Sequence, residues 1–253
     1  MKPMNEMSVL ITGGGSGIGE GTARYFARHG AKVTICGRRE EKLRAVAESI
    51  GSNCRYEVAD ITDDNDCARA VEAAVRHGGG LDALINNAGN MLRGPITEMK
   101  RSDLLDVFDS NVVSGMILTA LSVPHLEARR GAVIFIGSVH TRRSYPGASP
   151  YAATKGAVEV LAKVLAAELG PKGIRVNCVI PGAVSTELNI RAGIVSPEEQ
   201  TVRMRALEAS HALGRIGTEE ELAEAIAHMS CAEWTTGSSL VVDGGLALGI
   251  SNF

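Results

Sequence analysis

The sequence predicts a single α/β domain in which a doubly wound, parallel β-sheet is covered by helices on both faces. Short runs rich in β-branched residues alternate with longer amphipathic stretches along the whole chain, and most of these runs are continuously apolar. Strands buried on both faces have that pattern, and strand–helix alternation builds right-handed parallel units. No linker or low-complexity segment divides the 253 residues. We therefore expect one domain spanning residues 1–253.

The elements follow from the same alternation. Strands are expected at Val9–Thr12, Val33–Cys36, Arg55–Ala59, Leu81–Asn86, Ala132–Gly137, Arg175–Ile180 and Leu240–Val242. Helices are expected at Gly17–His29, Glu40–Ile50, Asp64–His77, Ser102–Arg129 and Tyr151–Leu169. Glycine follows each of these helices closely and is expected to supply the left-handed residue that ends it, at Gly30, Gly51, Gly78, Gly131 and Gly170.

Two capping boxes predict further helix starts late in the chain, at Ser196–Glu199 and Thr218–Glu221. The first lies in the least regular region of the sequence, residues 183–215, which follows a strand. Long excursions of this kind are often functional lids in α/β proteins. We expect a substrate-binding lid at 183–215.

Composition excludes several classes of partner. The net charge is −3 and the charges are interspersed, so no basic stripe predicts nucleic-acid binding. No apolar run approaches the ~18 residues of a membrane span, and the start, Met1–Met7, lacks the long apolar stretch of a signal peptide. Five cysteines lie far apart, with no C-x-x-C pair. That pattern predicts reduced thiols, a cytoplasmic location, and neither a disulfide nor a metal site.

The first predicted strand runs directly into a glycine-rich loop and then a helix. Residues 12–19 read T-G-G-G-S-G-I-G, with five glycines in seven residues. Glycines let the backbone approach a ligand closely, and a helix N-terminus offers free N–H groups and a positive dipole end. The alternative is a simple tight turn, but the glycine density favours a phosphate cradle.

The spacing of this loop, T-G-x-x-x-G-x-G, resembles that of the short-chain dehydrogenase/reductase family. Further motifs of the family follow in order: Asn86-Asn87-Ala88-Gly89, Asn111, Ser138, Tyr151-x-x-x-Lys155, Pro181-Gly182-x-x-x-Thr186 and Val242-Asp243-Gly244-Gly245. The resemblance covers nearly the whole chain. It implies a Rossmann-like fold and hydride transfer between NAD(P)(H) and a secondary alcohol or ketone.

Tyr151 and Lys155 are one helical turn apart, so their side chains share a face. A free tyrosine has a pKa near ~10, and a neighbouring ammonium, aided by an oxidised nicotinamide, favours the phenolate and lowers that pKa. Such a tyrosine can exchange a proton with an alcohol or ketone. Ser138, at a strand end, can bind the substrate oxygen. Taken singly, these residues are more typical of a solvated helix pair and a strand terminus, but together with the glycine loop they favour the catalytic interpretation.

The resemblance assigns further residues. Asn111 is the fourth catalytic residue, which holds a water in a proton relay with Lys155. The cofactor is expected to contact residues along the whole chain, namely Gly13, Gly15, Ser16, Gly17, Ile18, Gly19, Arg38, Arg39, Asp60, Ile61, Asn87, Ala88, Gly89, Tyr151, Lys155, Pro181, Gly182, Val184 and Thr186.

The residues after the second strand bear on cofactor preference. Gly37 stands where relatives specific for NAD carry an acid, and the guanidinium of Arg38 could meet the ribose phosphate of NADP. NADP(H) is therefore favoured, with NAD(H) open, because Ser16 replaces the second basic residue of some NADP users. Arg38 and Arg39 could also simply begin a solvated helix, and Asp60 could be a helix cap.

The substrate is expected between the nicotinamide and the segment after Gly182. Expected walls are Asn90, Met91, Leu92, Ser138, Val139, His140, Tyr145, Tyr151, Leu188 and Ile190, with no catalytic role for His140. Arg142 and Arg143 raise the possibility of an anionic substrate such as an acyl thioester, but could equally be solvated. Small residues in Tyr151–Leu169 and the family habit predict a homo-oligomer, a tetramer, formed through this helix and the last strand.

Two alternatives remain at this point. A non-catalytic redox sensor would bind the dinucleotide but is expected to have a damaged catalytic tetrad, whereas this one is intact. Among enzymes, 3-oxoacyl thioester reduction and the oxidation of steroids, polyols or simple secondary alcohols all remain open, because a fold does not select a substrate.

Overall fold

The structure is a computed structural model that describes residues 1–249. One sheet of seven parallel strands has the order β3-β2-β1-β4-β5-β6-β7. The strands are β1 (Ser8–Thr12), β2 (Lys32–Gly37), β3 (Cys54–Val58), β4 (Ala83–Asn86), β5 (Ala132–Ile136), β6 (Arg175–Pro181) and β7 (Ser239–Val242). The predicted doubly wound fold and all seven strands are confirmed, with ends that differ by at most two residues.

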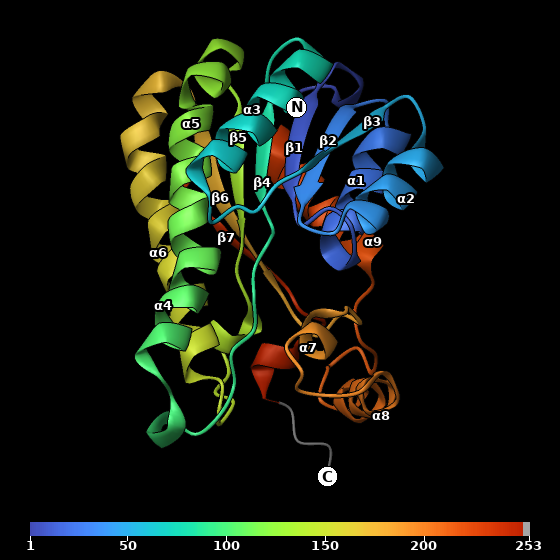
Figure 1. The fold of residues 1–253 in the computed structure, drawn as a ribbon, viewed down its shortest axis with the longest axis vertical. Coiled ribbons are helices and arrows are strands. Elements are labelled where there is room, and N and C mark those ends of the chain that lie inside the picture. The colour runs from blue at the N-terminus through green and yellow to red at the C-terminus, as the bar shows by residue number, and fades with distance from the viewer. Residues whose placement is uncertain (250–253) are drawn as a thin grey trace.

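Helices cover both faces of the sheet (Figure 1). One layer contains α1 (Gly17–Arg28), α2 (Glu40–Ile50) and α9 (Glu219–Cys231), and the other α3 (Asp64–Gly78), α4 (Arg101–Phe108), α5 (Ser114–Arg129) and α6 (Ser149–Leu169). Each layer closes its own apolar core against the sheet. All five residues of β5 are buried, as the continuous apolar pattern predicts for a strand covered on both faces.

The excursion after β6 forms two helices, α7 (Leu188–Arg191) and α8 (Pro197–Glu208), which lie beyond the carboxyl ends of the strands (Figure 1). Both predicted capping boxes are present: Ser196 and Glu199 begin α8, and Thr218 and Glu221 begin α9. In each, the hydroxyl accepts from the backbone N–H three residues on, and the carboxylate accepts in return.

Only two of the five expected helix-ending glycines have a positive φ, Gly30 and Gly51. After α3 the left-handed residue is Gly79, and after α5 it is Arg130, with φ 51°. Gly78 and Gly131 serve close packing instead: a Cβ on Gly78 would lie 2.1 Å from Ser8 Oγ. The fifth, Gly170, is right-handed and begins a 3-10 turn.

The predicted helix Ser102–Arg129 is interrupted by a π-helical turn, Asp109–Val113, between α4 and α5. By length and composition alone Arg101–Arg129 is apolar enough to cross a membrane, with a mean hydropathy of 1.4. The sequence analysis did not identify it as such, because polar residues interrupt its apolar ones. Its inner face packs on the sheet through the fully buried Leu118 and Leu126. Its outer face leaves Val113 and Met116 44% and 47% exposed.

Candidate active site

A cavity of about 330 Å³ opens at the carboxyl ends of the strands. It lies where the strand order reverses, between β1 and β4, and the lid residues of α7 and α8 cover it. Ligands of doubly wound sheets bind at such a switch point, because the loops on either side turn away in opposite directions. The cavity is therefore the expected ligand site of this fold.

The glycine loop forms one wall. Gly13 and Gly17 have φ values of 67° and 58°, which only glycine adopts readily, and Gly17 begins α1. Gly19 lies inside the first turn, where a Cβ would be 2.4 Å from the Gly13 carbonyl oxygen. The loop thus presents free backbone N–H groups of a helix start to the cavity, which fits the phosphates of a dinucleotide.

The loop after β4 is tied to this wall through Thr12. The Thr12 hydroxyl accepts from the backbone N–H groups of Asn87 (3.1 Å) and Ala88 (2.9 Å), and the Asn87 amide donates to the Thr12 carbonyl at 2.8 Å. Sequence reasoning placed many residues correctly along the cavity: Gly13, Ser16, Gly17, Ile18, Arg38, Asp60, Ile61, Asn87, Ala88, Gly89, Pro181, Gly182, Val184 and Thr186. Gly15 and Gly19 do not line it.

The two arginines after β2 have different surroundings. Arg38 lines the cavity with its guanidinium 3.7 Å from the Asp60 carboxylate, while Gly37 contributes no side chain at the end of β2. Arg39 points elsewhere, with one guanidinium nitrogen 2.9 Å from Glu187 and another 3.0 Å from Ser16 Oγ. Asp60 also accepts from the Thr62 backbone at 3.1 Å, so it stabilises the turn before α3 while facing the cavity.

Ser138, Tyr151 and Lys155 come together as predicted. All three line the cavity and are 6–7% exposed. Ser138 follows β5, and Tyr151 and Lys155 lie one turn apart on α6, with the ammonium 5.6 Å from the centre of the phenol ring. Lys155 Nζ donates to the Ile136 carbonyl at 2.8 Å, which holds it against the end of β5.

Burial dominates the proton affinities of this group. It raises the pKa of Tyr151 to about 12, opposed in part by a hydrogen bond with Ser138. It lowers the pKa of Lys155 to about 8. In the chain by itself the pKa of Tyr151 is therefore raised, because excluding water from the phenol outweighs the hydrogen bond with Ser138. The lowering expected from Lys155 together with an oxidised nicotinamide stays a prediction.

Asn111 lies in the π-helical turn between α4 and α5. Its amide donates to the Asn90 carbonyl at 2.9 Å and to Thr154 Oγ1 at 3.0 Å, and its oxygen accepts from the Asn90 backbone at 2.7 Å. A Cβ on Gly89 would lie 2.9 Å from the Asn111 oxygen and 3.8 Å from Lys155 Nζ. Asn111 is therefore close to the catalytic group but lies beneath the main cavity, in a smaller one beside Lys155. Single π-turns of this kind occur often at functional sites.

The wall facing the expected nicotinamide was predicted in part. Asn90, Met91, Val139, His140, Tyr145 and Leu188 line the cavity as expected, whereas Leu92 and Ile190 do not. Sequence reasoning missed Arg93, Asn189, Arg191, Arg203, Met204, Leu207 and Leu246. Only Met204 and Leu207 carried a signal, as apolar residues three apart in a predicted helix. For the arginines nothing in the sequence indicated the direction of the side chain.

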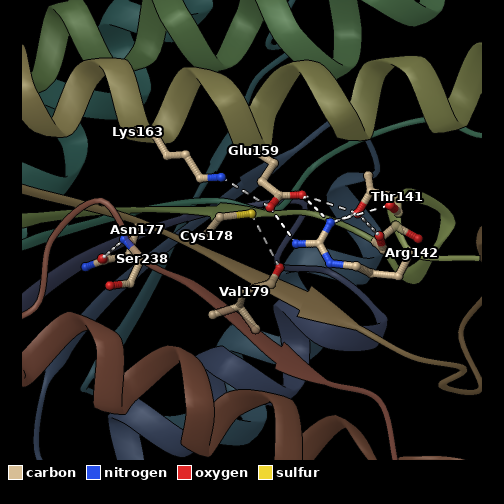
Figure 2. Close-up of polar contacts among 9 residues, drawn as sticks. Thr141, Arg142, Glu159, Lys163, Asn177, Cys178, Val179 and Ser238 are labelled. Carbon is tan, nitrogen blue, oxygen red and sulfur yellow. Dashed lines mark hydrogen bonds and ion pairs between the residues drawn. The ribbon is translucent and has the colours of Figure 1, made fainter. Parts of the chain in front are cut away.

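The two arginines suspected of binding an anion do not line the cavity. Arg142 points toward α6, where its guanidinium binds the Glu159 carboxylate at 2.5 Å, with Lys163 3.7 Å from the same carboxylate (Figure 2). Arg143 donates to the Leu246 carbonyl at 3.3 Å. Both are satisfied within the fold.

Within residues 1–249, no group of three or more His, Cys, Asp or Glu side chains could hold a metal ion. The residues present fit a dinucleotide: a glycine cradle, a cavity continuous from Arg38 to Tyr151, and the backbone segments at Gly89 and Gly182 on either side of it.

Comparison with known proteins agrees with this geometry. A family model described as Enoyl-(Acyl carrier protein) reductase matches residues 13–247. The chain is 37% identical to glucose 1-dehydrogenase of Gluconobacter oxydans, over 95% of this chain and 91% of that protein. It is 36% identical to L-fucose dehydrogenase of Bos taurus, over 95% and 89%.

Solved structures give the same result. A short-chain dehydrogenase/reductase of unknown function from Caenorhabditis elegans, with cofactor, superposes with a TM-score of 0.93 at 27% identity, covering 98% of both chains. The 3-ketoacyl-(acyl-carrier-protein) reductase of Brucella melitensis, complexed with NADH, has a TM-score of 0.86 at 34% identity, covering 95% of this chain and 98% of that one.

Proposed function

The chain belongs to the short-chain dehydrogenase/reductase family, and we propose that Tyr151 is its proton-transfer residue, assisted by Ser138, Lys155 and Asn111. The protein is an NAD(P)-dependent oxidoreductase acting on CH–OH groups or the corresponding ketones. The observation that carries the assignment is the buried contact of Ser138 with Tyr151 at the cavity, one helical turn from Lys155.

The chain's own residues supply positioning and the proton. The Ser138 hydroxyl binds the substrate oxygen and directs it to the Tyr151 phenol, which donates its proton to a ketone or accepts one from an alcohol. A bound nicotinamide donates or accepts the hydride. Because burial raises the pKa of Tyr151 to about 12, the phenol holds its proton at neutral pH and is ready to protonate a ketone.

Lys155 lies beside the Tyr151 ring and is hydrogen-bonded to the end of β5. Its ammonium lies 5.6 Å from the phenol ring, favours any phenolate that forms, and can bind the nicotinamide ribose. Asn111 lies close to Lys155 Nζ at the Gly89 backbone and assists by holding this corner of the site in place, because its side chain bonds to Asn90 and Thr154.

The experiment compares Tyr151→Phe with wild type for nicotinamide turnover against a panel of ketones and secondary alcohols. Turnover should fall by about 10³-fold or more, while cofactor binding changes little, because only the proton-transfer atom is removed. Tyr25→Phe, on α1 and outside the cavity, is the matched control. Undiminished turnover in Tyr151→Phe would refute the assignment.

For the cofactor we propose a preference for NADP(H). It is supported by Gly37, which places no acid at the end of β2, and by Arg38, whose exposed guanidinium lines that end of the cavity 3.7 Å from Asp60. A ribose phosphate placed there would receive bidentate hydrogen bonds from the guanidinium. NAD(H) lacks this phosphate.

We also propose a homotetramer in the cytoplasm. Two exposed apolar surfaces support the assembly: the outer face of α5, with Met116 47% exposed, and that of α6, with Val160 and Val164 59% and 48% exposed. Strand β7 is the last strand of the sheet and offers a free edge. The five cysteines, all free and buried, are consistent with a reducing compartment.

A further inference from the structure

Two arginines meet at the substrate end of the cavity. Arg93 lies in the segment after β4 and Arg203 on the lid helix α8, so the two approach the cavity from opposite walls. Neither was expected from the sequence, and neither belongs to the proposed proton-transfer group.

Within residues 1–249 neither arginine has a carboxylate partner. Arg93 donates to the Pro146 carbonyl at 3.3 Å, and the Arg203 side chain has no hydrogen bond or ion pair with any residue that the structure describes. Acidic residues are not scarce, since the chain has 29 acidic and 26 basic residues. Several other arginines do pair with acids, among them Arg39–Glu187, Arg142–Glu159 and Arg215–Glu221.

The arrangement is electrostatically unfavourable without an anion. Burial lowers the pKa of Arg93, and the charge of Arg203 lowers it further. Two like charges that share a partly enclosed cavity raise the free energy of the folded chain unless a negative group lies between them. A cavity that keeps both therefore points to an anionic ligand.

A third group faces the same space. The imidazole of His140 is 3.0 Å from Ser138 Oγ through Nδ1, and its buried Nε2 has no partner among the described residues. The ring packs between Tyr145 and Tyr151, with ring centroids 4.4 Å and 5.1 Å away. Arg93, His140 and Arg203 all line this one cavity, and after burial the charges of the two arginines lower the pKa of His140 further.

The other α8 residues that line the cavity are apolar. Met204, which is 7% exposed, and Leu207 line the cavity next to Arg203. A ligand that meets these residues needs an apolar segment between its reacting carbon, at Ser138 and Tyr151, and its charged end.

We propose that the substrate is an oxo or hydroxy carboxylic acid whose carboxylate is bound between Arg93 and Arg203. This rests on the proposed function, because Ser138 and Tyr151 define where the carbonyl lies. The two guanidinium groups offer the planar, paired donors that a carboxylate accepts, and the unpaired imidazole nitrogen supplies a further polar contact.

The test measures nicotinamide turnover for a series of straight-chain oxo acids, with the ketone at successive carbons, and for their methyl esters. Wild type should prefer acids over esters by at least about tenfold in kcat/KM. Arg203→Gln and Arg93→Gln should each lower kcat/KM for acids by about 10- to 100-fold, mainly through KM, and leave the esters unchanged. Arg205→Gln, exposed on the same helix, is the matched control and should change neither.

A binding measurement separates this inference from the proposed function. Thermal stabilisation of Tyr151→Phe by the oxo acids, with cofactor present, should be lost on adding Arg203→Gln. If this pattern of binding is found but neither wild type nor any variant turns over the nicotinamide, the proposed function fails and the anion site stands. Tyr151-dependent turnover of acids and esters at equal rates overturns the inference alone. Tighter binding of phosphate monoesters than of oxo acids overturns the carboxylate assignment.

Discussion

Glu187, at the start of the lid, competes for cations beside the proposed ribose-phosphate site. Its carboxylate is 2.9 Å from Arg39 and 3.1 Å from Lys42, and these two cations lower its pKa. Arg39 also binds Ser16, which lines the cofactor cavity. Replacing Glu187 by glutamine keeps the shape of the side chain and removes the negative charge.

The size of the effect follows from exposure. The side chains of Glu187, Arg39 and Lys42 are 38%, 35% and 46% exposed, so each ion pair contributes only about 0.5 kcal/mol. Releasing two cations toward the phosphate should therefore strengthen NADPH binding by about 1 kcal/mol, roughly fivefold in Kd. NADH has no group to receive them, so its Kd should stay the same.

Fluorescence titration of both cofactors at low and high salt measures this directly. The NADPH gain should shrink as salt screens the half-exposed charges. Glu220→Gln, which removes a surface pair with Arg28 at 2.6 Å, is the matched control. An unchanged Kd for NADPH, or an equal change for both cofactors, would refute the reasoning and show that Glu187 only anchors the lid.

Three further predictions test other parts of the structure. Arg38→Ala should weaken NADPH binding by about tenfold and leave NADH within twofold; equal losses by titration would overturn the phosphate assignment. Arg175 donates at 2.9 Å to the carbonyls of Met229 and Ala232 at the end of α9. Arg175→Met should therefore lower the free energy of unfolding by about 3 kcal/mol and Tm by about 9 °C, as measured by thermal unfolding. A Tm within about 2 °C of wild type contradicts this. Burial lowers the pKa of His140 to about 4, so stability present above pH ~6.5 is lost as pH falls through 4. Urea unfolding of wild type and His140→Gln should show up to ~3 kcal/mol less acid loss in the variant, and parallel curves would show that His140 stays uncharged or is compensated.

Sequence patterns predicted the fold because its determinants are local. Continuous apolar runs located every strand, and the capping boxes located the starts of α8 and α9, where hydroxyl and carboxylate lie within one turn. Glycine was less informative. Gly78 and Gly131 follow helices as caps do, but each is required by a neighbouring strand, since a Cβ on Gly131 would lie 2.7 Å from the Asp82 carbonyl oxygen. Packing between distant segments leaves no local signal.

The site divides in the same way. Ser138, Tyr151 and Lys155 could be placed because strand ends and a single helical turn fix their geometry. The π-turn at Asn111 could not be predicted from the sequence. Neither could the raised pKa of Tyr151 in the chain by itself, because burial is a property of the whole fold. Arg142 and Arg203 differ only in what surrounds them: one meets Glu159, and the other faces the cavity.

The proposed lid has one charged residue near each proposed ligand, Glu187 near the cofactor and Arg203 near the substrate. At its start Glu187 lies on Arg39 and Lys42, and further along Arg203 faces Arg93. A ribose phosphate would compete with Glu187 for its cations, whereas a substrate carboxylate would neutralise the repulsion at Arg203. The two ligands therefore act on the lid with opposite sign: one weakens an existing ionic contact, and the other supplies a missing counter-charge. A bound carboxylate should therefore hold α8 at the cavity, whereas a bound ribose phosphate should loosen the segment that begins at Glu187.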